Sequence, residues 1–352
     1  MASLDDVARA AGVSTATVSR ALSGRGRTSE ATRERVRAVA AELGYVASAT
    51  AASLASGRAE NIGVVVPLMD RWFFATVLDG IASRLAPRGF DVTLYNLTDD
   101  PAQRRRLFET SLRRGRVDGL IVLSVALTDD EVARVRSLGL PVVGLGVPRS
   151  ELSGLRVDDT AVGRAAAEHL LALGHRDIAH IGQSLPPGSP SDPALDIPTR
   201  RRRGFDEAIA DASAGGAPVI GRYAEADFTV EGGRRAAHEL LGSPVPPTAV
   251  FAASDEMAYG VMTAARERGV AVPGELSVIG VDGHDLADLF GLTTIDQFPH
   301  AQGERAGEAM LAALDDPGVP DAALPAASLA FQLVARGSTA RLRGDEGAPE
   351  DS

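Results

Sequence analysis

Three side chains near the start of the chain are suited to reading the edges of DNA bases. Thr15 and Ala16 open a short segment of helical pattern, and Arg20 follows about one helical turn later. An arginine can donate two hydrogen bonds to guanine O6 and N7, and a threonine or alanine methyl can contact the methyl group of thymine. Nearby hydroxyl side chains suit phosphate oxygens; they are Ser14, Thr17, Ser19 and Thr32. These residue types favour recognition of double-stranded DNA.

Three short helices are expected to position these side chains. They are predicted over residues 4–11, 15–22 and about 29–43. Ser3 and Asp6 form a capping-box pattern at the start of the first helix, and Gly12 is its stop. Ser14 caps the second helix, and Gly44 ends the third. Two short helices joined by a glycine-containing turn, with a third closing the core, match the helix-turn-helix plan, although any small three-helix bundle shares this pattern.

The run from Leu4 to Tyr45 resembles the DNA-binding head of the lactose repressor (LacI/GalR) family. It reads LDDVARAAGVSTATVSRALSGRGRTSEATRERVRAVAAELGY, and the family pattern is TLxDVAxxAGVSxxTVSRVLN followed by VSxxTRxRVxxAxxxLGY. The resemblance implies a transcriptional regulator whose second helix reads the major groove. It also implies a homodimer, because two heads are needed to read a near-palindromic operator.

Charge and composition agree with a DNA-binding head on an acidic body. The first 58 residues hold eight arginines and five acidic residues, so this segment carries +3 and the rest carries −14 of the total of −11. Such a division suits a protein whose head alone contacts DNA. No apolar run is long enough to span a membrane, the start lacks a signal-peptide pattern, and the lack of cysteine fits a reducing compartment. We therefore expect a cytoplasmic protein with no membrane contact.

Residues 46–60 form a predicted hinge that is rich in alanine and serine. The resemblance implies a helix that orders on operator DNA and inserts a leucine, here Leu54, into the minor groove. This chain departs from the family, because Ala47-Ser48 replace the usual Pro-Asn and Ala52 replaces the usual arginine. A plain flexible linker stays open as the alternative.

The body from residue 61 onward alternates short apolar runs with helical stretches in two series of similar spacing. This pattern predicts a duplicated, doubly wound α/β plan with ligands at the carboxyl ends of the strands. The family resemblance continues to about residue 339 through VDDTAVGRAAAEHLLALGHRDIAHIG, SDEMAYGVMTAARERGVAVPGELSVIGVDG and LVARGST. It implies a two-lobed, periplasmic-binding-protein-like sensor domain that closes on a small molecule.

The expected domains follow from these patterns. They are a helix-turn-helix domain at 1–45, the hinge at 46–60, a sensor domain at 61–341 and a disordered tail at 342–352. Within the sensor, lobe one is expected at about 61–157 and 290–322, and lobe two at about 158–289 and 323–341. The tail carries no leucine heptad of the kind that tetrameric members add, which predicts a dimer.

The resemblance also implies a set of effector-binding residues. They are Asp70, Arg71, Phe73, Phe74, Arg201, Phe228, Ser254, Asp282 and Gln297. Charged and amide side chains of this kind suit sugar hydroxyls, and aromatic faces suit the apolar surface of a sugar ring. Phe73 and Phe74 could instead be core residues, and Asp282 could be a strand-end cap. Arg201 lies in a run of four arginines that otherwise indicates a solvated face.

Two departures from the family bear on the effector. Arg71-Trp72 stand where the family usually has Asn-Pro, and Gly146-Val147 stand where it often has an Asp-Arg pair for sugar hydroxyls. A proline-rich loop is predicted beside the cleft at 184–199. We therefore expect a sugar or sugar derivative other than a simple unmodified hexose.

The sequence disfavours two other classes of function, an enzyme and a periplasmic sugar carrier. No G-x-S-x-G, H-E-x-x-H or G-x-x-x-x-G-K-[ST] motif occurs, and the GLG at 144–146 lacks a third glycine, so an enzyme is disfavoured. His175 and His180 lie in GHRDIAHIG, a strand entry where a structural role is favoured over metal binding, and no metal or cofactor is predicted. A periplasmic sugar carrier would share the body but would lack the basic head.

Overall fold

The computed structural model describes residues 2–23, 28–45, 58–98, 100–112, 116–125, 127–147, 152–183, 196–216, 218–316 and 327–342. The chain forms two compact units, one of residues 1–61 with 115–118 and one of residues 62–114 with 119–352. Most of the predicted hinge, including Leu54, lies outside the described residues, as do 184–195 of the proline-rich loop and the tail from 343.

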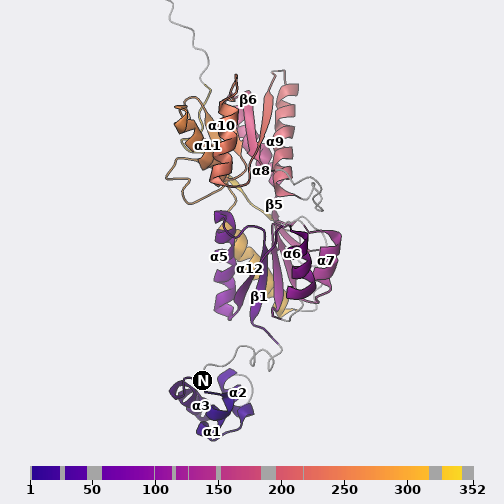
Figure 1. Ribbon diagram of the computed structural model, residues 1–352, viewed down its shortest axis with the longest axis vertical. Helices are drawn as coiled ribbons and strands as arrows, with labels where there is room; N and C mark the ends of the chain where they lie inside the picture. The colour runs from indigo at the N-terminus through magenta and orange to yellow at the C-terminus, as the bar shows by residue number, and fades with distance from the viewer. Residues whose placement is uncertain are drawn as a thin grey trace, which may run out of the picture. The chain divides into compact units, whose positions relative to one another are not determined.

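The described part of the first unit holds a bundle of short helices (Figure 1). The helices are α1 (Leu4–Ala11), α2 (Thr15–Ser23) and α3 (Glu30–Glu42). Ser3 caps α1 in a reciprocal capping box with Asp6, and Gly12 ends it in the left-handed conformation at φ 66°. One valine from each helix forms the fully buried centre: Val7, Val18 and Val36. The predicted helices of the head are confirmed.

The second unit consists of two α/β lobes, each built on one six-stranded sheet in the described residues (Figure 1). Sheet A of lobe one contains, in spatial order, β11 (Ala327–Leu329), β5 (Ser153–Val157), β4 (Val142–Leu145), β3 (Gly119–Leu123), β1 (Asn61–Val66) and β2 (Asp91–Asn96). Sheet B of lobe two contains β12 (Gln332–Val334), β10 (Thr293–Asp296), β9 (Ser277–Asp282), β8 (Ala249–Ala252), β6 (Asp177–Gly182) and β7 (Ile220–Glu225). The inner strands run parallel, whereas β10 and β12 are antiparallel.

Helices cover the faces of both sheets, as expected for buried parallel strands. Lobe one carries α5 (Trp72–Leu85), α6 (Pro101–Arg106), α7 (Asp129–Arg136) and α12 (Pro299–Asp315), with short helical turns η1 (Ala86–Arg88) and η2 (Leu107–Ser111). Lobe two carries α8 (Asp159–Ala172), α9 (Ile197–Ala214), α10 (Val230–Leu241) and α11 (Asp255–Glu267). The doubly wound α/β prediction is therefore confirmed. No described helix is both long enough and apolar enough to cross a lipid bilayer.

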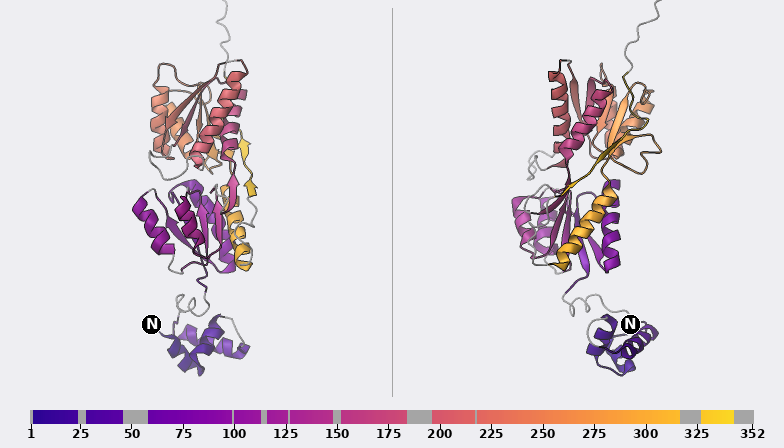
Figure 2. Two further views of the ribbon diagram at one scale, coloured as in Figure 1. Left: turned by 90° about the vertical axis from the view of Figure 1, so that its right-hand side faces the viewer. Right: turned by 180° about the vertical axis from the view of Figure 1, so that it is seen from behind.

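The crossings between the lobes correct the expected lobe boundaries. The described chain crosses from β5 to α8, from β10 to α12 and from β11 to β12 (Figure 2). The second crossing follows Asp296 rather than residue 290, because β10 pairs with β9 of lobe two. The third follows Leu329 rather than residue 322, because β11 pairs with β5 of lobe one. Strand pairing between distant segments decides both positions.

The end of the sensor also differs from expectation. The backbone N–H of Leu342 donates to the carbonyl of Leu173 at 2.9 Å, so ordered chain continues through Leu342. Leu342, which we expected to be the first residue of a disordered tail, is therefore part of the ordered sensor.

Candidate functional site

The described side chains predicted to contact DNA lie at or along α2, except for Thr32, which lies in the first turn of α3. Ser14, Thr15, Ala16 and Arg20 are exposed, and Thr17, Ser19 and Thr32 are half-buried. The Ser14 hydroxyl accepts a hydrogen bond from the backbone N–H of Thr17 at 3.3 Å. Arg20 donates from Nε to the carbonyl of Ala16 at 3.1 Å, which orders the guanidinium along the helix surface. The structure therefore places six of these residues within positions 14–20, on α2 or directly before it, with Ser14, Thr15, Ala16 and Arg20 accessible.

The start of α3 repeats the capping arrangement of α2. The backbone N–H of Thr32 donates to the Ser29 hydroxyl at 3.3 Å, and the two hydroxyl oxygens are 2.8 Å apart. Helix N-termini present backbone N–H donors that suit phosphate oxygens. The proposed contacts of these residues with DNA stay predictions, and so does the minor-groove role of Leu54, which lies outside the described residues.

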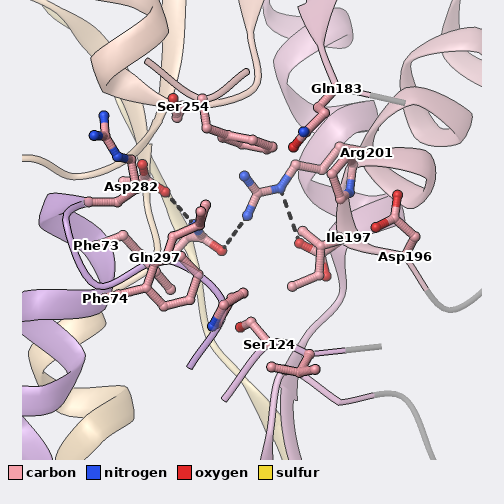
Figure 3. A pocket seen from close by; sticks show the side chains of 18 of the residues that line it. Phe73, Phe74, Ser124, Gln183, Asp196, Ile197, Arg201, Ser254, Asp282 and Gln297 are labelled. Atoms are coloured by element: carbon pink, nitrogen blue, oxygen red, sulfur yellow. Dashed lines mark hydrogen bonds and ion pairs between the residues drawn. The ribbon is translucent and has the colours of Figure 1, made fainter. Parts of the chain in front are cut away.

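A cavity of about 340 Å³ lies between the two lobes of the second unit (Figure 3). Its volume is within the range of small-molecule sites. Every predicted effector-binding residue except Asp70 lines it. Asp70 is exposed and forms an ion pair with Arg71, from Oδ2 to Nη2 at 2.7 Å. The structure thus assembles eight of the nine residues and leaves Asp70 outside, where it orients one of the lining side chains.

Buried polar side chains form a continuous hydrogen-bonded chain along one wall of the cavity (Figure 3). Arg201 donates from Nε to Asp159 Oδ1 at 3.1 Å, from Nη1 to the carbonyl of Ala253 at 2.6 Å, and from Nη2 to Gln297 Oε1 at 3.0 Å. Gln297 then donates from Nε2 to Asp282 Oδ1 at 2.9 Å. This Asp159–Arg201–Gln297–Asp282 chain fixes the direction of each polar group before any ligand arrives.

Burial controls the protonation of the two carboxyl groups in this chain. It raises the pKa of Asp282 well above its usual range, although the positive charge of Arg201 opposes the shift. It also raises the pKa of Asp159, again against the effect of Arg201. Because Asp282 is 7% exposed and lines the cavity, its carboxyl can act as donor or acceptor toward a ligand hydroxyl.

Local sequence explains how Arg201 reaches the cavity. Helix α9 starts at Ile197 with Asp196 as its cap and a proline in its first turn, so residues 197–199 are helical and not part of the predicted loop. A Cβ on Gly163 of α8 would lie 1.9 Å from the carbonyl oxygen of Arg201. Only a glycine there lets α8 and α9 approach this closely. Arg201 is consequently 5% exposed, whereas the side chains of Arg202 and Arg203 in the same run are 43% and 71% exposed.

The opposite wall, from lobe one, is largely aromatic and aliphatic. The rings of Phe73 and Phe74 meet edge to face with centroids 5.4 Å apart, and both also pack against the apolar core of lobe one. Gly146 lines the cavity at φ 71°, and a Cβ there would lie 2.6 Å from Ser124 Oγ. The two phenylalanines therefore serve both the core and the cavity, and Gly146 keeps this wall free of a larger side chain.

Backbone strain concentrates at the cavity. Three of its lining residues that are not glycine have positive φ: Ser124 at 48°, Phe228 at 57° and Asp282 at 131°. Conformations of this kind typically persist where the surrounding structure enforces them, often at binding sites. At Asp282, the side chain of this strained residue is also held by the hydrogen bond from Gln297. Ser254 caps α11 by accepting from the N–H of Met257 at 3.2 Å.

Several polar residues of the cavity were missed from the sequence. They are Asp159, Gln183, Asp227 and Glu256, together with Thr98, Arg104, Ser124, Asp196 and Gln302. Asp159 is the second residue after β5, in VDDTAVG, and Glu256 is the fourth residue after β8, in SDEMAYG, so both lie just beyond the carboxyl end of a strand. That position was the available signal. The described residues contain no cluster of three or more histidine, aspartate or glutamate side chains that could hold a metal ion.

Comparisons with known proteins agree with both units. Residues 3–48 match the family described as bacterial regulatory proteins, lacI family, and residues 167–339 match the periplasmic binding protein-like domain. The HTH-type transcriptional repressor CytR of Escherichia coli (strain K12) is 32% identical over 346 residues, 97% of each chain. The chain belongs to the LacI family. The family resemblance predicted from the sequence is confirmed.

Solved structures of LacI-family regulators share this fold. The lac repressor dimer bound to operator and the anti-inducer ONPF is 27% identical, with a TM-score of 0.79 over 96% of this chain and 99% of that one. The transcriptional regulator CelR in complex with cellobiose is 29% identical, with a TM-score of 0.66 over 96% of this chain and 100% of that one. Like its relatives, this chain is a DNA-binding transcriptional repressor with a small-molecule sensor domain.

Proposed function

We propose that this repressor binds a near-palindromic operator as a homodimer, and that a sugar or sugar derivative held between the lobes controls its operator affinity. The observation that carries the proposal is the buried Asp159–Arg201–Gln297–Asp282 chain, which lines a cavity of about 340 Å³ between the lobes. A ligand that touches both lobes shifts their arrangement by its differential affinity for the two states.

The chemistry of the cavity supports a polyhydroxylated ligand. Asp282, Gln297 and Gln183 offer carboxyl and amide groups that suit hydroxyls, and Phe73 and Phe228 offer apolar ring faces. The likeness to a cellobiose-bound regulator points in the same direction. Gly146 stands where the family often has an aspartate that grips sugar hydroxyls, which favours a derivative over a simple hexose.

The head supports the operator part of the proposal. Thr15, Ala16 and Arg20 lie on the accessible surface of α2, and a helix-turn-helix places this helix in the major groove. The similar lac repressor structure is a dimer on its operator. We propose residues 1–45 as the DNA-binding domain, 46–60 as the hinge and 61 to about 342 as the sensor of a cytoplasmic regulator.

The test is the response of operator binding to effector in Asp282→Ala. The effector is first found by screening mono- and disaccharides, cellobiose and ribose included, and their phosphates and glycosides for an increase in the melting temperature of the wild type. Operator titrations follow with and without that compound. Wild type should change its operator affinity by about 5- to 150-fold, the usual range of allosteric coupling.

The variant should bind operator normally without the compound and lose the response to it. Asp315→Ala, at the exposed end of α12, is the matched control and should respond as wild type does. A full response of Asp282→Ala at the same concentration would assign Asp282 a purely structural role and would move the effector site elsewhere.

A further inference from the structure

The only tryptophan of the chain, Trp72, bridges the two lobes. It begins α5 of lobe one, whereas its contacts follow β9 of lobe two. The indole ring stacks on His284 with centroids 4.4 Å apart and an interplanar angle of 26°. Its Nε1–H donates to Asp285 Oδ2 at 3.2 Å. A single side chain therefore makes an aromatic and a polar contact across the boundary between the lobes.

Arg71, the residue before Trp72, makes a second bridge. Its guanidinium pairs with Glu256 of α11, from Nη1 to Oε1 at 3.3 Å, while Nη2 is held by Asp70 of its own lobe. Both Arg71 and Glu256 line the cavity, and their side chains are 19% and 18% exposed. An ion pair that is mostly shielded from solvent is screened less than a surface pair. The two bridges start from consecutive residues, so they act at one point on the rim of the cavity.

The lobe-two side of these bridges is rigidly held. The backbone N–H of His284 donates to Asp255 Oδ2 at 2.8 Å, and its ring Nδ1 accepts from the N–H of Leu286 at 3.0 Å. Tyr259 packs edge-on against the same imidazole with centroids 5.4 Å apart. The His284 ring is therefore fixed on its own lobe, and its face is the docking surface for the Trp72 indole.

We propose that Arg71 and Trp72 of lobe one, with Glu256, His284 and Asp285 of lobe two, form a latch that holds the sensor closed without effector. The latch sets the ratio of closed to open sensor, and it therefore sets how much of the closure free energy an effector has to supply. Weakening it makes closure depend more strongly on the effector.

The contacts favour this role over a passive one. The indole stack and the ion pair join elements that belong to different sheets, and opening the cleft by moving one lobe away from the other breaks all of them together. The Asp159–Arg201–Gln297–Asp282 chain, by contrast, runs mainly through elements of lobe two. An aromatic pair of this kind can change the ratio of closed to open sensor by roughly 2- to 13-fold, in addition to the effect of burying its surface.

The experiment measures the distance between the lobes in the full chain without effector. The chain has no cysteine, so Arg105→Cys on α6 and Glu239→Cys on α10 provide label sites on lobe one and lobe two, both exposed. Doubly labelled chain is mixed with a large excess of unlabelled chain, so that the two labels report on one subunit. The distance distribution is then compared between wild type and latch variants.

Wild type should give mainly the short distance, with a minor population at the long distance that effector can still shift. Trp72→Ala and His284→Ala should each lower the ratio of short to long distances by roughly 2- to 13-fold. Trp72→Phe, which keeps a ring but removes the Nε1–H donor, should give a smaller decrease. His300→Ala removes an exposed histidine of α12 and should leave the distribution unchanged. Equal distributions in wild type, Trp72→Ala and His284→Ala would overturn the latch.

The fluorescence of Trp72 gives a second readout, because no other tryptophan contributes. Glu256→Gln and Arg71→Gln leave the indole and its stacking partner in place, so only opening of the lobes exposes the ring to acrylamide. Both variants should increase acrylamide quenching relative to wild type and to His300→Ala. Quenching as low as in wild type would show that the ion pair does not hold the lobes together.

The inference rests on the proposed function only where closure is coupled to DNA. Operator titrations of the same variants, without effector, separate the two claims. A change in both the distances and operator affinity supports both. A change in the distances with unchanged operator affinity keeps the latch and refutes control of the operator by closure. An unchanged distance distribution refutes the latch and leaves the proposed function to its own test at Asp282.

Discussion

The DNA-reading surface and the effector cavity hold polar residues in opposite ways. In the head, Thr15, Ala16 and Arg20 are exposed, and Arg20 donates a hydrogen bond to the carbonyl of Ala16 within its own helix. In the cavity, Arg201 and Asp282 are buried and are joined through Gln297. The head leaves these side chains accessible to a partner, whereas the polar side chains of the cavity are hydrogen-bonded to one another.

From this difference we can predict whether a substitution lowers the stability of the folded protein or weakens the binding of its partner. A buried polar group that loses its partner keeps the full penalty of having left water, so the folded state itself is destabilised. Truncation of an exposed side chain changes the free energy of unfolding little. Its effect appears in the free energy of binding to the partner. The following variants test that contrast.

The largest effect is expected for Arg201→Met, which leaves Asp159 and Gln297 without their donors. Breaking a buried ion pair costs about 3–5 kcal/mol, and the remaining pair of Arg200 with Asp159, at 3.8 Å, offsets part of that cost. Urea unfolding of the sensor, followed by circular dichroism, measures the change. Arg203→Met is the matched control, since Arg203 makes an i,i+4 pair with Glu207 and its side chain is 71% exposed. If both variants unfold at the same urea concentration, the buried chain does not stabilise the lobe.

Arg20→Ala should instead weaken operator binding by about 1–3 kcal/mol and leave unfolding nearly unchanged. Base choice should relax at one symmetric pair of operator positions, because the guanidinium would read a guanine. Binding to a library of operator variants measures both effects, and Arg9→Ala on α1 is the exposed-arginine control. Equal weakening on every sequence would make Arg20 a phosphate contact and would remove it from base recognition.

The buried His180 tests the same contrast between buried and exposed polar groups through the pH dependence of stability. Its imidazole is fully buried, stacks on Phe251 with centroids 4.5 Å apart, and donates from Nδ1 to the carbonyl of Phe251 at 3.1 Å. Burial lowers the pKa of His180 to about 3. The unfolded chain, with an ordinary pKa near 6.5, therefore binds the proton first, and stability falls as the pH drops below about 6.5.

The loss should reach about 2 kcal/mol at pH 5 relative to pH 7.5. His180→Phe keeps an aromatic ring and removes the titration. On acidification, the free energy of unfolding of the wild type should therefore fall by that amount relative to that of the variant. His300→Phe, at an exposed histidine, should follow the pH profile of the wild type. Parallel pH profiles for wild type and His180→Phe would show that His180 is protonated without cost in the folded protein.

The helices of the head could be predicted from the sequence because their signals are local. The capping box of Ser3 with Asp6 and the left-handed Gly12 both act within a few residues of the helix ends that they define. The alternating apolar runs of the body likewise predicted its parallel strands and covering helices. Patterns of this kind need only the period of the local structure.

The set of cavity residues came from the family resemblance, and tertiary structure decided what they do. The run of four arginines looked solvated, yet close packing of α8 and α9 at Gly163 turns Arg201 inward to Asp159. Glu256 and Asp159 carried no motif that separates them from ordinary helix-start acids. Their role depends on residues more than 40 positions away, and no local pattern contains that information.

The lobe boundaries and the bridge at Trp72 were likewise decided by the tertiary structure alone. Pairing of β10 with β9 and of β11 with β5 sets the crossings, and these pairs bring together strands from different parts of the chain. Trp72 was only an extra aromatic residue in the sequence, and it meets His284 because the two lobes approach at the rim of the cavity. The local elements and the family follow from the sequence, since caps, periodicity and motifs are all short-range features of the chain. The burial of Arg201, the strain at Asp282 and the bridge between the lobes depend on long-range packing.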